Sequence, residues 1–297
     1  MATGSEELYM LNKRDEQESN RLRTQHEFLR ILSNGHLLHP MIPLDKVSSV
    51  ADIATGTATW LIDLKKSLAA VPRTGAAPCY FHGFDISAAQ YPADPGDIVL
   101  TLHDAREPFP SEFHGRFDVV HVRLLVLAVK ETEIKQTLAN VVELLNRMAE
   151  LSSTGPGGYL QWDDYHNDLI GWNAPSTLEE TWDIIRDYAR SAGLSNQLPI
   201  FLGNAATELG LQDVTSVEYS SLSKPELVKM AQQWYLGGLK ALLPVALRRS
   251  GRTKTEEETL ARIQHYERES IEEFKRNVVP DLRYVTVIAK KPAELLS

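Results

Sequence analysis

The sequence predicts an α/β fold in which a parallel sheet carries helices on both faces, and three observations support this. Short apolar runs of strand length recur between residues 47 and 165, with amphipathic or turn-forming segments between them. Strands that alternate with helices imply parallel βαβ units. The chain closes on YVTVIAKK, which has the alternating pattern of a strand. With 297 residues and 43% hydrophobic content, the chain can bury a large core.

The first half of the chain can be divided into elements in order. Leu22 and Leu29 lie on one face of an expected helix over residues 5–34, and Asn34-Gly35 ends it. Expected strands then cover residues 47–55, 79–86, 97–104, 117–125 and 159–162, and expected helices cover residues 58–70 and 133–151.

The second half departs from simple alternation. A mostly helical stretch precedes the final strand, and because it cannot lie inside the sheet, we expect it to form a lid. The chain therefore divides into an N-terminal helical cap at 1–45 and a main domain at 46–297, with helical insertions at about 166–200 and 224–280. The remaining expected elements are helices over residues 177–193 and 204–211 and strands over residues 215–222 and 284–291.

Composition argues against several kinds of partner. The formal net charge is −9 and no cluster of Lys and Arg is present, so we expect no nucleic acid. No apolar run approaches the roughly 20 residues of a membrane-spanning helix, so we expect no membrane partner. Cys79 is the only cysteine, which argues against disulfides and a cysteine-based zinc site, and we expect no metal. The charged N-terminus is unlike a secretory signal, which favours a cytoplasmic protein.

The turn after the first expected strand indicates a ligand site. Residues 52–58, DIATGTA, leave a strand and open a helix, and small residues there let a ligand approach the backbone amides. Asp85 and Asp104 stand at the ends of the next two strands, where open α/β sheets bind ligands. The Asp85 carboxylate could accept hydrogen bonds from both ribose hydroxyls of a ligand. The Asp104 carboxylate could accept a hydrogen bond from an adenine amino group.

Two other interpretations of this turn are open. It could be an ordinary tight connection, with the aspartates as turn formers. It could also belong to a dinucleotide site, whose G-x-G-x-x-G would need glycine or a close substitute where this chain has Ala54, Gly56 and Thr59. S-adenosylmethionine (SAM) has no pyrophosphate and demands less of such a loop, so the turn favours SAM over NAD.

The ordered motifs resemble those of a known family. VADIATGTATWLIDL, GFDIS followed by QYP, HDA-x-x-PFP-x-EF, FDVVHVRLL and PGGYLQW follow one another as in fungal class I SAM-dependent methyltransferases of secondary metabolism. The ES-x-RL-x-x-QH and LLHP-x-IP segments and the closing KKP are similar to the same family. The resemblance implies a Rossmann-like methyltransferase sheet flanked by helices, with SAM as cofactor and S-adenosylhomocysteine (SAH) as product.

The resemblance also implies roles for individual residues. Asp52 and Gly56 would shape the site for the amino-acid moiety of SAM, and Asp85 would hold the ribose. Ala54 and Ala58 replace glycines of the family's turn. We expect binding to survive, because only a positive φ strictly demands glycine and alanine suits the start of a helix. The implied cofactor site comprises Asp52, Ala54, Thr55, Gly56, Asp85, Ile86, His103, Asp104, Ala105, His121 and Val122.

Residues near the ends of the fourth and fifth strands are candidates for proton transfer. His121, Asp163 and His166 could each act as a general base, although a lone histidine is more often solvated or structural. Asp163 and Asp164 are adjacent, so only one of them can face the site if the strand continues.

The acceptor itself would be held by apolar and cationic side chains. Arg123 could bind a carboxylate or form a structural salt bridge. Trp172 and Trp234 fall in the segments expected to form the lid, whereas Trp182 is assigned to core packing. The expected substrate-binding residues are Gln25, His26, Arg123, Trp162, Trp172 and Trp234.

Together these features predict a SAM-dependent O-methyltransferase for a small-molecule acceptor. A carboxylic acid is favoured and a phenol comes next, because no strong His–acid dyad shows in the sequence and a carboxylate needs no base. The alternative is a SAM-fold protein that no longer methylates and acts as a regulatory partner or rearrangement catalyst. The N-terminal helix could cover its own cofactor or that of a second subunit in a homodimer.

Overall fold

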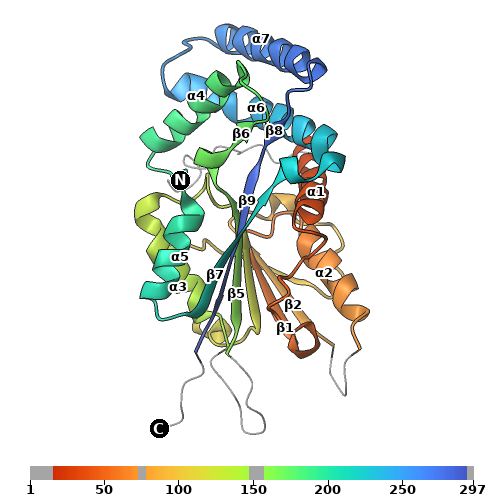
Figure 1. Ribbon diagram of the computed structural model, residues 1–297. Helices are drawn as coiled ribbons and strands as arrows, with labels where there is room; N and C mark the ends of the chain where they lie inside the picture. Colours follow the sequence, from red (N-terminus) through yellow and green to blue (C-terminus); the bar gives the residue numbers. More distant parts are fainter. Residues whose placement is uncertain (1–15, 73–77, 147–156, 293–297) are drawn as a thin grey trace.

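A seven-stranded sheet forms the centre of the computed structural model, which describes residues 16–72, 78–146 and 157–292 (Figure 1). The strands are β1 (Ser49–Ile53), β2 (Tyr80–Asp85), β3 (Val99–Leu102), β4 (Val119–Arg123), β5 (Tyr159–Tyr165), β7 (Gln212–Ser220) and β9 (Arg283–Lys290). Their order is β3-β2-β1-β4-β5-β9-β7. Strands β1 to β5 are parallel, and β9 runs antiparallel to β5 and β7. The predicted fold class is confirmed.

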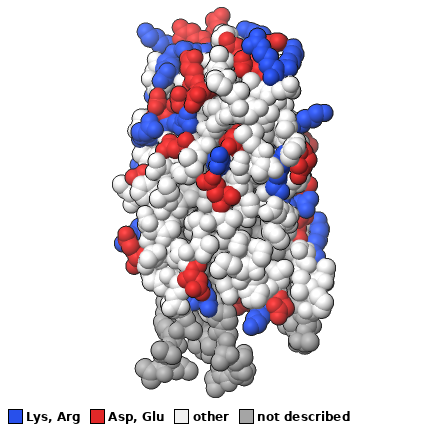
Figure 2. Space-filling view, viewed as in Figure 1, with Lys and Arg blue, Asp and Glu red and all other residues white. Residues whose placement is uncertain are grey.

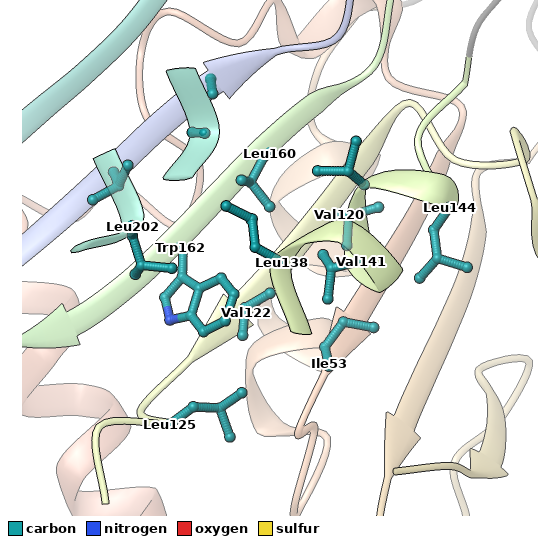
Figure 3. Close-up of a cluster of buried hydrophobic side chains, with 14 of the residues drawn as sticks. Ile53, Val120, Val122, Leu125, Leu138, Val141, Leu144, Leu160, Trp162 and Leu202 are labelled. Atoms are coloured by element: carbon teal, nitrogen blue, oxygen red, sulfur yellow. The ribbon is translucent and has the colours of Figure 1, made fainter. Parts of the chain in front are cut away.

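Helices cover both faces of this sheet. α1 (Glu16–Leu32) and α2 (Thr59–Ala69) lie on one side, and α3 (Ile134–Glu143) and α5 (Leu198–Glu208) lie on the other (Figure 1). The central strands are buried almost throughout, as in parallel sheets with two covered faces. Figure 3 shows Trp162 of β5 inside the core between Leu138 and Leu202.

Several elements have other bounds than predicted: α5 and β7, for example, begin before the predicted helix 204–211 and strand 215–222. Two differences have a clear structural cause. α3 stops at Glu143, because the chain then turns to run beside the start of β4, where the amide of Asn146 donates to the carbonyl of Phe117 at 2.8 Å. The rest of the expected helix, at 147–151, lies outside the described residues. β5 continues to Tyr165, since Asp163 pairs with both β4 and β9, and Asp164 and Tyr165 pair with β9.

A helical cap lies over the carboxyl ends of the parallel strands (Figure 1). It consists of α4 (Leu178–Ser191), α6 (Val228–Arg249) and α7 (Glu256–Lys275), which pack against one another, and of the short strands β6 (Gly171–Trp172) and β8 (Pro280–Asp281). The cap has a hydrophobic core of its own, to which α1 contributes Phe28 and Leu32. The helices expected as a lid before the last strand therefore stand above the end of the sheet where ligands of this fold class bind.

The visible surface is mixed in charge. Figure 2 shows Lys and Arg interspersed with Asp and Glu around the cap, and a largely uncharged face below it. Within the described segments, no helix combines the length and apolar character that a bilayer crossing requires.

Candidate active site

Two adjoining cavities lie between the carboxyl ends of the strands, α1 and the cap. The first is enclosed by the turn after β1, by the ends of β2, β3 and β4, and by α1. The second has a volume of about 390 Å³ and lies between α1, α4, α6 and the ends of β4 and β5. Leu22, Gln25 and Leu124 line both cavities, so they mark the junction between them.

Three residues of the turn after β1 have left-handed backbone angles. Ala54 has a φ of 57°, and Gly56 and Ala58 each have a φ of 53°. The expectation that these alanines avoid positive φ is therefore wrong. Ala58 is the N-cap of α2 and precedes its first helical residue. Each alanine keeps the backbone path that glycine would take, at a cost of about 1–2 kcal/mol.

Asp85 holds this turn against the end of β2. One carboxylate oxygen accepts from the amide of Gly56 at 2.8 Å, and the other accepts from the amide of Ser87 at 3.0 Å. Each oxygen of an ionised carboxylate keeps further acceptor capacity. Asp85 also lines the first cavity, so its carboxylate lies beside any ligand bound there.

Asp104 lines the same cavity next to Ile86, His103 and Ala105. Its carboxylate is paired with Arg106, whose guanidinium donates to it at 2.6 and 3.0 Å. Burial alone would raise the pKa of Asp104, but the hydrogen bonds from Arg106 lower it on balance. The carboxylate is therefore ionised and fixed at the end of β3.

Two buried polar atoms on the wall of the first cavity have no hydrogen-bond partner among the described residues. They are Thr55 Oγ1 and Gln90 Nε2. Buried polar atoms are nearly always paired in folded proteins, so each indicates a ligand group that would complete it. Together with Asp85, they fit a ligand as rich in hydroxyl and amino groups as SAM.

Arg123 lies at the end of β4 and lines the first cavity. No described carboxylate lies within 4.0 Å of it, so the alternative of a structural salt bridge finds no partner in this part of the chain. Its guanidinium donates to His26 Nδ1 at 3.1 Å, and His26 Nε2 is 3.1 Å from Asp63. Burial and the Arg123 charge lower the pKa of His26 to about 4, so this histidine is neutral and orients the arginine.

His121 is fully buried beneath the cavities rather than on their walls. Its Nδ1 is 2.7 Å from Asp52, its Nε2 is 3.0 Å from Asp163, and its ring stacks on Trp60 at 3.6 Å. Burial disfavours the charged imidazolium, but the two carboxylates outweigh it and raise the pKa of His121. No sequence pattern indicates this cluster, because it depends on the register in which Asp52 pairs with His121.

The remaining predicted residues fall outside both cavity walls. Val122 and Trp162 face the core on the opposite side of the sheet from His121, because side chains alternate along a strand. Trp172 packs in the cap core against Tyr235. His166 follows β5, and its amide donates to the carbonyl of Arg283 on β9. The structure thus brings none of the three base candidates, His121, Asp163 and His166, to a cavity wall.

The second cavity has an aromatic wall. Tyr165 contacts the ring of Trp234 at 5.0 Å, and Trp234 contacts the ring of Trp182 at 5.5 Å. All three line the cavity, so Trp182, assigned to the core, contributes to it, and Trp234 lies where it was expected. Burial raises the pKa of Tyr165, and the nearby Gln25 and Arg21 only partly oppose that shift, so the phenol is neutral.

Sequence reasoning missed the loop that forms the junction. Leu124 has a φ of 62° and lines both cavities. Asp164 holds the loop by accepting from the amides of Leu125 at 2.8 Å and Val126 at 3.1 Å. Burial raises the pKa of Asp164 to about 7. The position of Leu124 directly after an apolar strand was the available signal. Also missed were Glu18, Leu22, Ile53, Thr57, Thr59, Gln90, Arg106, Leu125, Ala128 and Val129.

The order of this sheet and the cavity at its carboxyl edge are those of the class I methyltransferase fold. No family model matches the chain. It is 30% identical over 257 residues to methyltransferase grgD from Penicillium sp, covering 85% of this chain and 87% of that protein. It is 32% identical over 161 residues to N-methyltransferase verN from Clonostachys rogersoniana, covering 53% of this chain and 50% of that protein.

Among solved structures, phosphoethanolamine N-methyltransferase 2 from Haemonchus contortus, in complex with SAM, matches with a TM-score of 0.48 and 14% identity. The match covers 90% of this chain, which spans about half of that structure, 52%. The similarity to grgD alone shows that the chain belongs to the family of fungal SAM-dependent methyltransferases.

Proposed function

We propose that the protein transfers the methyl group of SAM to a carboxylate oxygen of a small, largely apolar acid. The observation that carries the proposal is the makeup of the second cavity. Among the described residues that line it, none is Asp, Glu or His. An acceptor in this cavity finds no side chain suited to take a proton at neutral pH. Its reacting atom must therefore already be deprotonated when the acceptor binds.

A carboxylate meets that requirement better than a phenol. The ordinary pKa of a carboxylic acid is near 4 and that of a phenol near 10, so at pH 7 only the acid is ionised. The acceptor oxygen forms its new bond to carbon as the sulfur–carbon bond breaks, and no proton is released. Alignment of the two partners can then supply roughly 7–11 kcal/mol of the barrier reduction.

The first cavity would hold the cofactor, and SAM would supply an activated methyl group there. Asp85 would accept from the ribose, and Thr55 and Gln90 would satisfy their unpaired atoms on the ligand. Ile86 and Asp104 would border the adenine of the cofactor. The junction formed by Leu22, Gln25 and Leu124 supports placing the reacting atoms between the two cavities.

Arg123 supports an anionic acceptor. It lines the first cavity without a carboxylate partner within the described residues, and His26 orients it. Its planar guanidinium suits a carboxylate. The carboxylate of SAM would compete for this role. Arg123→Met should raise KM for the acid alone if the acceptor is bound there, and KM for SAM alone if the cofactor is.

A nitrogen acceptor is the second candidate. Four relatives, verN, gliN, tcpN and sirN, are named N-methyltransferases and are 26–32% identical to this chain. An amine can attack as its free base, which also needs no protein base. The protein that no longer methylates is less well supported, because Ala54 and Ala58 keep the left-handed turn on which the cavity depends.

Incubation of the full chain with SAM and matched acceptors tests the proposal. The panel contains aromatic carboxylic acids, phenols, amines and lactams, with product identification by mass spectrometry. Methyl esters from the acids are expected. Methylation confined to nitrogen would replace the oxygen proposal by the second candidate, and SAH binding without any product would favour the non-methylating alternative. A homodimer and a cytoplasmic location are further parts of this proposal.

A further inference from the structure

The second cavity carries two buried hydrogen-bond donors without acceptors. Tyr165 Oη and Trp182 Nε1 make no well-formed hydrogen bond with any described residue, and the side chains of Gln25 and Trp234 lie near Tyr165 Oη without reaching that geometry. Trp182 is 2% exposed and Tyr165 is 4% exposed, so solvent does not serve them in place of a partner. Both side chains line the cavity and flank Trp234. An indole nitrogen can only donate, so the missing partner is an acceptor atom.

Packing does not require the two consecutive glycines in the middle of α6. A Cβ at Gly237 would have no heavy atom within 4 Å, and a Cβ at Gly238 would meet only Trp182, at 3.9 Å. Glycine is the poorest helix former after proline, so this pair weakens the helix. Both line the second cavity. What their missing side chains provide is therefore space beside the aromatic wall.

The charge of the cavity wall limits what can enter. Arg21 is the only charged side chain among the described residues that line it, and Glu18 pairs with Arg21 through two contacts of 2.7 Å. No described acid on the wall could balance a buried cation. Burying an unpaired charge is costly, so the body of the bound molecule is uncharged.

We infer that the second cavity binds a flat, uncharged ring system which stacks over Gly237 and Gly238 and presents a carbonyl-type oxygen to Tyr165 and Trp182. The volume of about 390 Å³ is within the range of small-molecule sites. This inference rests on the proposed function, because the reacting carboxylate would extend from the ring toward Leu22, Gln25 and Leu124. The substrate class is then an aromatic or heteroaromatic acid with a ring oxygen acceptor remote from its carboxylate.

A matched pair of probes tests the inference. Chromone-2-carboxylic acid carries a ring carbonyl, and naphthalene-2-carboxylic acid has a similar shape without it. Binding of each to the full chain is measured by calorimetry in the presence of saturating SAH. The chromone acid should bind about 5–10-fold more tightly, and Tyr165→Phe and Trp182→Phe should each reduce that ratio at least twofold, in line with single hydrogen bonds.

Gly237→Leu tests the cavity itself. Leucine raises helix propensity, so the variant should fold, while its side chain occupies the space beside the aromatic wall. Affinity for both probes should fall at least tenfold, and SAH affinity should change less than about threefold. Lys229→Leu, on an exposed position of the same helix, is the control and should bind both probes as the unmodified chain does.

The outcomes separate this inference from the proposed function. Failure of the unmodified chain to bind either probe, equal affinity for the two probes, or unchanged binding by Gly237→Leu would each overturn the inference. If acids are methylated but Gly237→Leu has no effect on their KM, the function stands and the cavity assignment fails. If both probes bind as expected and no acid is ever methylated, the cavity assignment stands and the proposed function fails.

Discussion

Restoring glycine at Ala54 and Ala58 should stabilise the protein. An alanine in the left-handed region costs about 1–2 kcal/mol, and both residues have φ values between 53° and 57°. Glycine removes that cost but gives back about 0.4–1 kcal/mol through the greater freedom of the unfolded chain. The difference is a gain of about 0.5–1 kcal/mol in the free energy of unfolding for each substitution. The double variant should gain about 1–2 kcal/mol if the two effects add.

Urea unfolding followed by tryptophan fluorescence measures this gain as a rise in the midpoint at unchanged slope. Ala261→Gly is the matched control, because Ala261 is exposed in the right-handed helix α7. The same substitution there should lower the free energy of unfolding by about 1 kcal/mol. Destabilisation of Ala54→Gly and Ala58→Gly as large as that of Ala261→Gly would refute the assignment of backbone strain to this turn. Calorimetry with SAH would show in parallel whether the turn keeps its binding geometry.

Three further predictions follow from the charged groups. Asp85→Ala should reduce SAH affinity in calorimetry at least about thirtyfold, because it removes ligand contacts and the anchor of the turn; an unchanged affinity would place the cofactor elsewhere. His121→Gln should lower the free energy of unfolding by about 3–5 kcal/mol, because Asp52 and Asp163 lose the buried imidazole that both contact. A loss of turnover alone, at full stability, would instead make His121 a base. Burial lowers the pKa of His82 to about 4, so between pH 6.5 and 4 the unfolded state binds more protons and stability is lost as the pH falls. Between pH 7 and pH 4, His82→Gln should therefore lose about 3 kcal/mol less free energy of unfolding than the unmodified chain. Equal losses would contradict this.

The sheet could be predicted because its signals are local. Buried parallel strands appear as short apolar runs, and their carboxyl ends necessarily meet at one edge, which is why Asp85 and Asp104 were both expected at the ligand site. Pairing between strands is not local. The contact of His121 with Asp52 needs the register of β1 against β4, and the burial of Trp162 needs the helices that cover that face.

The acceptor side was the hardest part to predict for the same reason. Trp172 and Trp182 both lie in cap segments, and the pattern around them does not tell which one faces a cavity. Leu124 reaches the junction only because its backbone takes a positive φ, which an apolar residue after a strand does not indicate. The turn alanines were misjudged because the sequence does not reveal φ directly.

The shared wall formed by α1 has a thermodynamic consequence. Leu22 and Gln25 border both cavities, so a ligand that fixes α1 from one side prepares it for a ligand on the other. Such coupling is reciprocal: whatever factor SAH adds to acceptor affinity, the acceptor must add to SAH affinity. Part of that factor can be conformational entropy surrendered once and shared by both ligands. α1 is therefore the element through which ligands in the two cavities would be coupled.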